Sequence, residues 1–180
     1  MTYGNLQAPN VSVESLPPSS QRDLRSDHAG EAGAVMIYRG ILKLTKDPEI
    51  AEFAKNHLET ERKHLLLFES WMPKTHQSKL IFLWKVSGFL TGAIAGLGSK
   101  YFTYLTIQTI ETFVIAHYQR QITSGPPELS QMLRALQLDE TKHRKEAEAL
   151  LNKAPNLMER FWRYAVEQGS RGAVSMARLI

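Results

Sequence analysis

The sequence predicts an all-α protein, in which a four-helix bundle carries a long apolar crossover helix and an extra C-terminal helix. Apolar residues recur at every third or fourth position over most of the chain after residue 20, as they do in helices with one buried face. No stretch of useful length alternates apolar and polar residues in the manner of a strand. Proline or glycine interrupts the helical pattern at Pro48, Pro73, Gly125 and Pro155, which divides it into separate helices.

The composition is that of a folded domain and excludes several kinds of chemistry. The chain has 180 residues, of which 43% are hydrophobic and 22% are charged, enough for one domain with a substantial core. It contains no cysteine, which excludes disulfides, zinc–cysteine sites, iron–sulfur clusters and thiol catalysis. The net charge is only +4, and Lys and Arg are dispersed among acidic residues, so we expect no nucleic-acid partner.

Residues 1–20 differ from the rest of the chain. They contain Pro9, Pro17 and Pro18 with several Ser and Asn, and they have no Lys, Arg or long apolar block. This composition predicts a flexible lead-in rather than a secretory signal or an Arg-rich transit peptide. We therefore expect a single bundle domain over residues 21–180.

Four stretches carry the inward-facing stripes of the bundle helices, and two Glu-x-x-His elements stand on these stripes. The stripes run from Leu24 to Leu42, from Ile50 to Trp71, from Tyr104 to Tyr118 and from Leu129 to Leu150. Each Glu-x-x-His element follows another inward-facing glutamate. The two halves of the pattern are Glu31 with Glu61 and His64, and Glu111 with Glu140 and His143. The two glutamates are 30 residues apart in the first half and 29 in the second.

This doubled pattern indicates a site for two metal ions. Residues three apart share a helix face, so each element can direct a carboxylate and an imidazole at one ion. An interval of 29 or 30 residues lets the chain complete one helix, turn, and return antiparallel to the same level. Chance alone gives about 0.5 Glu-x-x-His matches in a chain with 14 Glu and 6 His among 180 residues. A single match is therefore weak, whereas two matches with preceding glutamates are specific.

Burial strengthens the metal hypothesis, because an unpaired carboxylate on an apolar face is costly. The alternative is a core of neutral histidines and of glutamates that reach solvent. We assign Glu31, Glu61 and His64 to one ion, and Glu111, Glu140 and His143 to the other. Glu61 and Glu140 are the expected bridges, since each lies beside its own histidine. Such ligands suit iron or manganese, which the sequence does not distinguish, and two bridged ions can share the electrons for O₂ chemistry.

The 50 residues between Glu61 and Glu111 must contain the crossover between the helix pairs, as in ferritin-like bundles. Residues 80–98 read LIFLWKVSGFLTGAIAGLG, in which three glycines are spaced by four and Lys85 is the only charged residue. We weigh three interpretations of this stretch. It is a glycine-faced helix packed within the bundle or a dimer, or an apolar surface that rests in a bilayer leaflet and admits a lipid-soluble substrate, or a transmembrane span.

The segment from Leu157 onward combines aromatic and basic residues. Phe161, Trp162 and Tyr164 stand beside Arg160 and Arg163, a pattern typical of an amphipathic helix at a membrane interface. The alternative is a helix that caps the bundle.

Five further residues lie near the proposed ligands: His28, Tyr38, His117, Tyr118 and Asp139. Asp139 either accepts a hydrogen bond from the free ring N–H of a ligand histidine or is a solvated helix residue. The two histidines either orient substrate or relay protons, or they are core histidines with satisfied hydrogen bonds. The two tyrosines line the core or a pocket, with a radical role as the alternative. Beyond the metal ligands, the sequence identifies no catalytic residue.

His57 lies one helical turn before Glu61, but no companion residue indicates a third metal ion.

Residues 27–34, DHAGEAGA, followed by Ile37 and Tyr38, resemble the opening motif of the demethoxyubiquinone hydroxylase family. The two Glu-x-x-His elements, and Glu111 with His117 and Tyr118, match that family's remaining blocks in order. The resemblance covers about residues 22–150. It implies a ferritin-like di-iron monooxygenase of ubiquinone biosynthesis, which inserts one oxygen atom from O₂ into a polyprenylated demethoxy-quinol ring. The ligands that it implies are the six already selected by spacing.

The resemblance also implies two iron ions per chain, NADH as the ultimate reductant and work at a membrane surface. The lead-in has no mitochondrial presequence, which favours a bacterial enzyme on the cytoplasmic face of the inner membrane. A homodimer and an accessory protein that presents the quinone are further expected partners. Two other functions compete with this one: a ferritin-like iron oxidase or storage protein, and a non-enzymatic helical scaffold that binds quinone or lipid.

Overall fold

The computed structural model describes residues 6–180, which form six α-helices and three short 3₁₀ helices. The α-helices are α1 (Pro18–Leu44), α2 (Pro48–Trp71), α3 (Ile81–Leu97), α4 (Lys100–Ser124), α5 (Ser130–Ala149) and α6 (Leu157–Ala177). The 3₁₀ helices are η1 (Val13–Ser15), η2 (Lys74–His76) and η3 (Pro127–Leu129). These described residues contain no strand, so the all-α prediction is confirmed.

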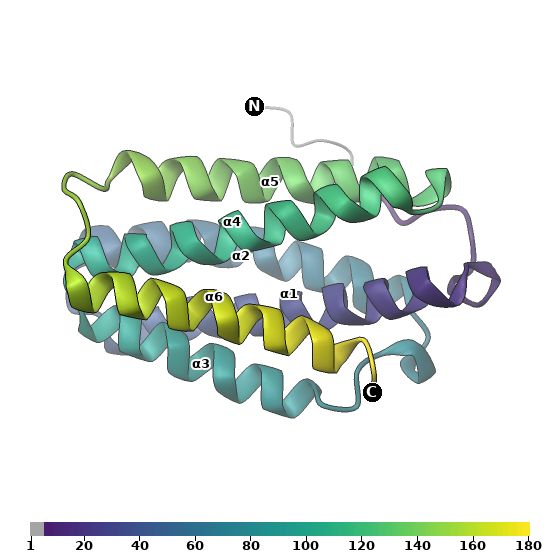
Figure 1. Cartoon of the computed structure of the whole chain (residues 1–180), viewed down its shortest axis with the longest axis horizontal. Helices are drawn as coiled ribbons and strands as arrows, with labels where there is room; N and C mark the ends of the chain where they lie inside the picture. Colours follow the sequence, from purple (N-terminus) through teal and green to yellow (C-terminus); the bar gives the residue numbers. More distant parts are fainter. Residues whose placement is uncertain (1–5) are drawn as a thin grey trace.

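The helices form the expected bundle of two antiparallel pairs. Helix α1 packs on α2, and α4 packs on α5 (Figure 1). Helix α3 carries the chain from the first pair to the second and lies along α1, while α6 lies against both α4 and α1. The ferritin-like bundle with a crossover helix and an additional C-terminal helix is therefore confirmed.

Side chains just before three helices set where those helices begin. The carboxylate of Asp47 accepts hydrogen bonds from the first backbone amides of α2, and the hydroxyl of Ser99 accepts one from α4. At the start of α6, Asn156 and Glu159 form a reciprocal capping box. These contacts satisfy amides that have no partner within the helix, which stabilises each helix end.

Two clusters of buried apolar residues fill the bundle on either side of a charged layer. One cluster includes Leu24, Phe68, Tyr118 and Leu136, and the other includes Val35, Leu58, Ile107 and Ala147. On each of α1, α2, α4 and α5, one member of each cluster flanks the charged residues of the inward stripe. The charged layer is therefore enclosed by apolar side chains at both ends.

Helix α3 approaches α1 closely along its face of glycines. A Cβ atom on Gly92 would lie 1.9 Å from the carbonyl oxygen of Ile37, and one on Gly88 would lie 2.4 Å from that of Gly33. Only glycine permits backbones to pack this tightly. The glycine spacing thus serves helix packing inside the chain.

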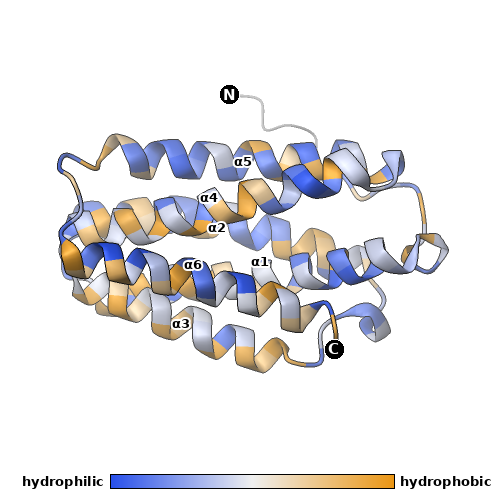
Figure 2. Cartoon of the chain, in the orientation of Figure 1, coloured by the Kyte–Doolittle hydropathy of each residue, from blue (hydrophilic) through white to orange (hydrophobic). Residues whose placement is uncertain are grey.

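The other face of α3 leaves large apolar side chains exposed: Phe82, Leu83, Val86, Leu90, Ile94 and Leu97. Neighbouring α6 adds Leu157, Met158, Phe161 and Tyr164. We call these ten residues the apolar face; apolar residues of α3 and α6 are orange in Figure 2. Within residues 6–180, no helix is both long and apolar enough to cross a membrane.

The structure describes residues 6–20 of the expected lead-in, and part of this segment packs against the bundle. Residues 18–20 already belong to α1, and Val13 and Leu16 are buried in the apolar cluster around Leu24. The indole N–H of Trp71 donates a hydrogen bond to the carbonyl of Val11. The scattered apolar residues of this segment bury themselves against the bundle, a contact that composition does not reveal. Residues 1–5 lie outside the described part of the chain.

Candidate metal centre

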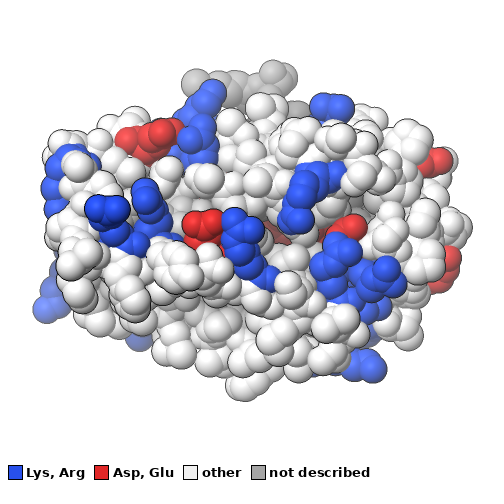
Figure 3. Space-filling view, in the orientation of Figure 1, with Lys and Arg blue, Asp and Glu red and all other residues white. Residues whose placement is uncertain are grey.

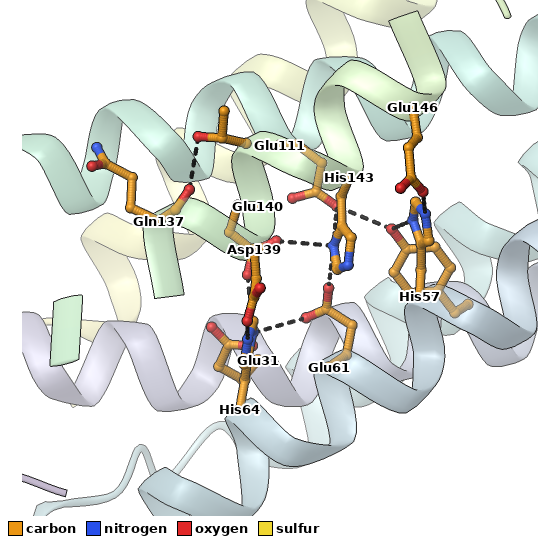
Figure 4. A network of polar contacts seen from close by, with 12 residues as sticks. Glu31, His57, Glu61, His64, Glu111, Gln137, Asp139, Glu140, His143 and Glu146 are labelled. Carbon is orange, nitrogen blue, oxygen red and sulfur yellow. Dashed lines mark hydrogen bonds and ion pairs between the residues drawn. The ribbon is translucent and has the colours of Figure 1, made fainter. Parts of the chain in front are cut away.

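Six side chains from four helices meet in the charged layer (Figure 4). They are Glu31 of α1, Glu61 and His64 of α2, Glu111 of α4, and Glu140 and His143 of α5, and all are buried. Their potential ligand atoms form two groups, each within 4.8 Å: Glu31, Glu61, His64 and Glu140, and then Glu61, Glu111, Glu140 and His143. Glu61 and Glu140 belong to both groups, which is the arrangement expected of bridging carboxylates.

Both imidazoles direct Nδ1 at the carboxylates. His64 Nδ1 lies 3.1 Å from Glu140 Oε1 and 3.5 Å from Glu31 Oε2. His143 Nδ1 lies 3.1 Å from Glu61 Oε1 and 3.2 Å from Glu140 Oε2. Each histidine therefore contacts the glutamate of the other Glu-x-x-His element.

Five inward-facing atoms of this cluster make no hydrogen bond to any described residue. They are Glu31 Oε2, Glu61 Oε1, Glu140 Oε2, and Nδ1 of both His64 and His143. They lie 3.1–3.5 Å from other members of the cluster. A buried polar atom without a hydrogen bond still costs about 1–3 kcal/mol, so such a concentration requires compensation. Oxygen and imidazole donors around two shared carboxylates fit a pair of divalent iron or manganese ions.

The ionisation of the cluster agrees with that fit. Burial raises the pKa of Glu31 to about 8; burial and the neighbouring Glu140 and Glu61 raise the pKa of Glu111 well above its usual range. Burial lowers the pKa of His143, but contacts with Glu140 and Glu61 outweigh it and raise that pKa to about 11. The pKa of His64 is likewise raised, against burial, by Glu31 and its other acidic neighbours.

These directions favour protons on Glu31, Glu111, His64 and His143 in the metal-free cluster. Divalent ions that bind these residues would take the place of such protons.

Asp139 holds the outer side of one proposed ligand. Its Oδ2 lies 3.2 Å from Nε2 of His64, on the ring edge opposite the carboxylates. A proton on Nε2 leaves Nδ1 with a free lone pair that points into the cluster, as a metal ligand needs. The structure thus favours the first of the two interpretations of Asp139.

Two buried tyrosines each contact one outer glutamate. The hydroxyl of Tyr38 donates to Glu111 Oε1 at 3.0 Å, and the hydroxyl of Tyr118 donates to Glu31 Oε1. Each tyrosine hydroxyl contacts Oε1 of its glutamate, so Oε2 remains available for another contact. These contacts fix the orientation of the two carboxylates that belong to only one group.

The remaining sequence candidates, His117 and His28, have different surroundings. His117 Nε2 lies 2.9 Å from Asp27 Oδ1, which also accepts a hydrogen bond from Gln121. His28 is buried and makes no hydrogen bond to a described residue. Burial, together with nearby Lys85, lowers the pKa of His28 to about 4, so it is neutral at pH 7. Neither histidine belongs to the two ligand groups.

Two residues that the sequence analysis did not select adjoin the cluster. His57 is buried, and its ring stacks on that of His143 with centroids 4.1 Å apart. Its Nε2 lies 2.8 Å from Glu146 Oε2 (Figure 4). Spacing could have identified both residues, because His57 lies one helical turn before Glu61 and Glu146 lies one turn after His143.

An apolar cavity of about 690 Å³ adjoins the cluster. The four proposed ligand glutamates line it together with Asp27: Glu31, Glu61, Glu111 and Glu140. Its walls come mainly from α1, α3, α4 and α6, and small residues keep it open, among them Gly30, Gly33, Ala34, Gly169 and Gly172. The cavity thus connects the charged layer with the side of the bundle formed by α3 and α6.

Comparison with known proteins identifies a family that matches nearly the whole chain. The sequence model described as ubiquinone biosynthesis protein COQ7 matches residues 18–177. The NADPH-dependent 3-demethoxyubiquinone 3-hydroxylase, mitochondrial, of Dictyostelium discoideum is 31% identical over 134 residues, 68% of this chain and 60% of that protein. The protein of the same name from Mus musculus is 31% identical over 103 residues, 56% of this chain and 48% of that protein.

A bacterial relative carries a related name. The 3-demethoxyubiquinol 3-hydroxylase of Psychrobacter arcticus is 29% identical over 129 residues, which cover 69% of this chain and 60% of that protein. The chain therefore spans only between 48% and 60% of the length of these three relatives.

Proposed function

Because the chain belongs to the ubiquinone biosynthesis protein COQ7 family, whose sequence model matches residues 18–177, we propose that it hydroxylates a polyprenylated demethoxy-quinol with O₂. The proposed product is the 3-hydroxylated quinol of ubiquinone biosynthesis. One observation carries the proposal: a buried cluster with the donors for two metal ions opens directly onto an apolar cavity.

Six residues hold the proposed metal ions: Glu31, Glu61, His64, Glu111, Glu140 and His143. Two iron ions bound there would supply the electrons and the Lewis acidity that the reduction of O₂ needs. Insertion of one oxygen atom into a ring C–H bond consumes O₂, two electrons and two protons, and it releases one water molecule. Two apolar clusters exclude bulk water from this layer, which protects reactive oxygen species from unproductive reactions.

The cavity supports a substrate that is apolar and elongated. In this proposal the quinol ring lies beside the glutamates that line the cavity, and the tail follows walls that pass between α1, α3, α4 and α6 toward the apolar face. A polyprenyl tail gains about 25 cal/mol for each Å² of apolar surface that it buries in such a channel. The tail therefore supplies binding energy, and the ring is held at the metal centre.

The apolar face supports docking on a bilayer, from which a polyprenylated substrate enters. Exposed Arg160 and Arg163 adjoin Phe161 on α6, and Figure 3 shows more Lys and Arg than Asp and Glu on this side of the molecule. Apolar residues rimmed by basic ones suit the interface of an anionic membrane. In a bacterium the membrane that the apolar face meets is the inner membrane, on its cytoplasmic side. A homodimer or an accessory protein that presents quinone would assemble around the apolar face.

We propose the reductant only by its chemical class, which includes both NADH and NADPH. The names of the mitochondrial relatives specify NADPH, whereas the sequence analysis expects NADH. We take a reduced nicotinamide nucleotide as the ultimate source of the two electrons, and the comparison of NADH with NADPH belongs to the experiment that tests the function.

The function is tested by loading the protein with iron under anaerobic conditions, measuring iron per chain, and then supplying demethoxy-quinol, reductant and ¹⁸O₂. We expect two irons per chain and a product that carries one ¹⁸O atom, identified by mass spectrometry. The Glu61→Ala protein is the control without a bridging ligand and should give no product. Iron-loaded protein that consumes O₂ and never hydroxylates the quinol, with detergent present, would contradict the proposal and favour the iron oxidase. Absence of product with the wild-type protein, together with equal binding of quinol or lipid by the wild-type and Glu61→Ala proteins, would favour the non-enzymatic scaffold.

A further inference from the structure

A continuous series of hydrogen bonds joins the metal centre to the surface of the protein. Tyr38 Oη lies 3.0 Å from Glu111 Oε1 and 3.1 Å from His57 Nδ1. His57 Nε2 lies 2.8 Å from Glu146 Oε2. Three links thus connect four side chains from α4, α1, α2 and α5.

The two ends of this series face different environments. Glu111 is buried among the proposed ligands. The side chain of Glu146 is 45% exposed, and its Oε1 lies 3.8 Å from Nζ of surface Lys142. One carboxylate oxygen of Glu146 therefore faces solvent while the other contacts the buried imidazole.

Neighbouring rings hold the middle of the series in place. The ring of His57 stacks on that of His143, with centroids 4.1 Å apart and an angle of 15° between the planes. The ring of Phe53 also packs on His57, with centroids 4.1 Å apart. An imidazole with one nitrogen toward Tyr38 and the other toward Glu146 can accept a proton on one edge and donate one from the other. Its fixed orientation keeps both contacts within hydrogen-bond distance at once.

We propose that Glu146, His57 and Tyr38 form a proton path that delivers protons from solvent to Glu111 during the reduction of O₂. Before a transfer, Glu146 is protonated and donates to His57 Nε2. At this stage His57 Nδ1–H donates to Tyr38 Oη, and Tyr38 donates to Glu111 Oε1. Three short transfers then leave the proton on Glu111 Oε1. Every hydrogen bond is reversed in direction, and Glu146 becomes an anion. A proton from water then binds Glu146 again, so one proton has moved inward. Before a second proton can follow, Glu111 must pass its proton on, His57 must regain the tautomer with its proton on Nδ1, and the Tyr38 hydroxyl must turn back toward Glu111.

The path is separate from the route proposed for the quinol. None of Tyr38, His57 and Glu146 lines the apolar cavity. Protons therefore enter between α2 and α5 while the substrate enters between α3 and α6. This separation lets the enzyme take up the two protons of its reaction without admitting water along the substrate channel.

A second contact between the cluster and a partly exposed carboxylate cannot serve the same purpose. Asp139 meets Nε2 of His64, but Nδ1 of that ring points at the proposed metal ions. A nitrogen that coordinates a metal carries no proton, so this ring holds a proton without passing one through. His57 differs because it belongs to neither ligand group.

The inference rests on the proposed metal centre but is tested without quinol or O₂. Metal ions that bind buried carboxylates and imidazoles displace protons, which must reach solvent. Cobalt(II) is mixed with metal-free protein in weak buffer; visible absorbance follows metal binding, and a pH indicator follows proton release. In the wild-type protein we expect the two signals to rise together. In the Glu146→Gln protein we expect proton release to lag roughly tenfold behind binding, with the same final amount of metal and of protons. The Tyr38→Phe protein also loses the hydroxyl that orients Glu111, so its lag is measured at cobalt concentrations that saturate its sites.

The matched control is Glu148→Gln, which removes an exposed carboxylate of the same helix that pairs with Arg144 and not with His57. Its signals should coincide as in the wild type. Millimolar acetate, a small proton carrier, should abolish the lag of the Glu146→Gln protein. Proton release that keeps pace with cobalt binding in both path variants would overturn the proposal, even if the protein hydroxylates quinol. A lag that acetate leaves unchanged would also overturn it, because it would indicate a merely structural role.

Discussion

Gly92 of α3 lies so close to Ile37 of α1 that a Cβ atom on the glycine would stand 1.9 Å from the Ile37 carbonyl oxygen. No rotamer change relieves such an overlap, because both partners are backbone. The two helices meet along this line, and α1 carries Glu31 while α3 forms a wall of the cavity. The distance between these helices therefore affects both the proposed metal centre and the proposed substrate channel.

We expect Gly92→Ala to destabilise the protein by about 2 kcal/mol or more, since overpacking of this kind typically costs about 1–3 kcal/mol. For a domain of this size that lowers the midpoint of thermal unfolding by roughly 5 °C. The control is Gly172→Ala in α6, where an added Cβ meets no atom within 4 Å. It should raise stability by about 0.5–1 kcal/mol through helix propensity. Equal stability of the Gly92→Ala and wild-type proteins in thermal denaturation would refute the close contact.

Spacing along the helices was sufficient to predict the fold and the convergence of six residues. The 3.6-residue period places Glu61 and His64 on one helix face, and near-equal intervals place the paired helices at the same level. These relations are local or depend only on helix length. The structure accordingly brings the six predicted ligands together.

Contacts that depend on how helices are rotated and offset against one another were not predictable in this way. The His57–Glu146 contact joins α2 to α5 across 89 positions of sequence, and neither residue type identifies its partner. The burial of Val13 and Leu16 was hidden for a similar reason, since composition describes a segment without the surface on which it packs. The cavity also depends on what α6 leaves unfilled, and sequence periodicity does not report empty space.

Metal affinity should rise with pH between 6 and 8. Burial raises the pKa of Glu31 to about 8, and contacts with Glu140 and Glu61 raise that of His143 to about 11. Both groups hold protons below these values, so metal must displace them, and each displaced proton makes apparent affinity about tenfold higher per pH unit. Cobalt competition with a chelator at pH 6, 7 and 8 measures this dependence. An affinity that is constant over that range would show that the ligands bind no protons in the metal-free protein.

Removal of a shared glutamate should affect metal binding more than removal of an outer one. Glu140→Ala deletes a ligand from both groups, whereas Glu31→Ala deletes one from a single group. We expect Glu140→Ala to lose both ions and all hydroxylation, and Glu31→Ala to retain about one ion per chain with its affinity lowered at least hundredfold at the damaged position. Cobalt titration with metal analysis distinguishes these cases, and Glu148→Gln serves as the control. Retention of two ions by the Glu140→Ala protein would exclude it as a bridge.

Membrane docking should depend on the apolar face and not on exposed apolar residues elsewhere. Phe82 and Leu97 are 77% and 70% exposed on α3, so replacing both by Ser removes little folding energy. If each inserts into a bilayer, its loss costs roughly 2 kcal/mol of binding, which is at least about a hundredfold for the pair. Sedimentation with vesicles that contain anionic lipid measures this loss. The control is Leu138→Ser on α5, which is 63% exposed and should bind vesicles like the wild type.

Filling the cavity should impair long-tailed substrates without disturbing the metal ions. Gly169 lines the cavity, and a Cβ added there meets no atom within 4 Å, so Gly169→Leu can fold normally while its side chain occupies the channel. We expect kcat/KM for a polyprenylated demethoxy-quinol to fall roughly ten- to a hundredfold, because the ring no longer reaches its reactive position. A tailless quinol should lose less, and metal content should stay at the wild-type value. Ser175→Leu is the matched control, since it places the same side chain on α6 outside the cavity. Equal losses for both quinols would indicate that the tail takes another route, and an unchanged kcat/KM for the long-tailed quinol would remove the cavity from the reaction altogether.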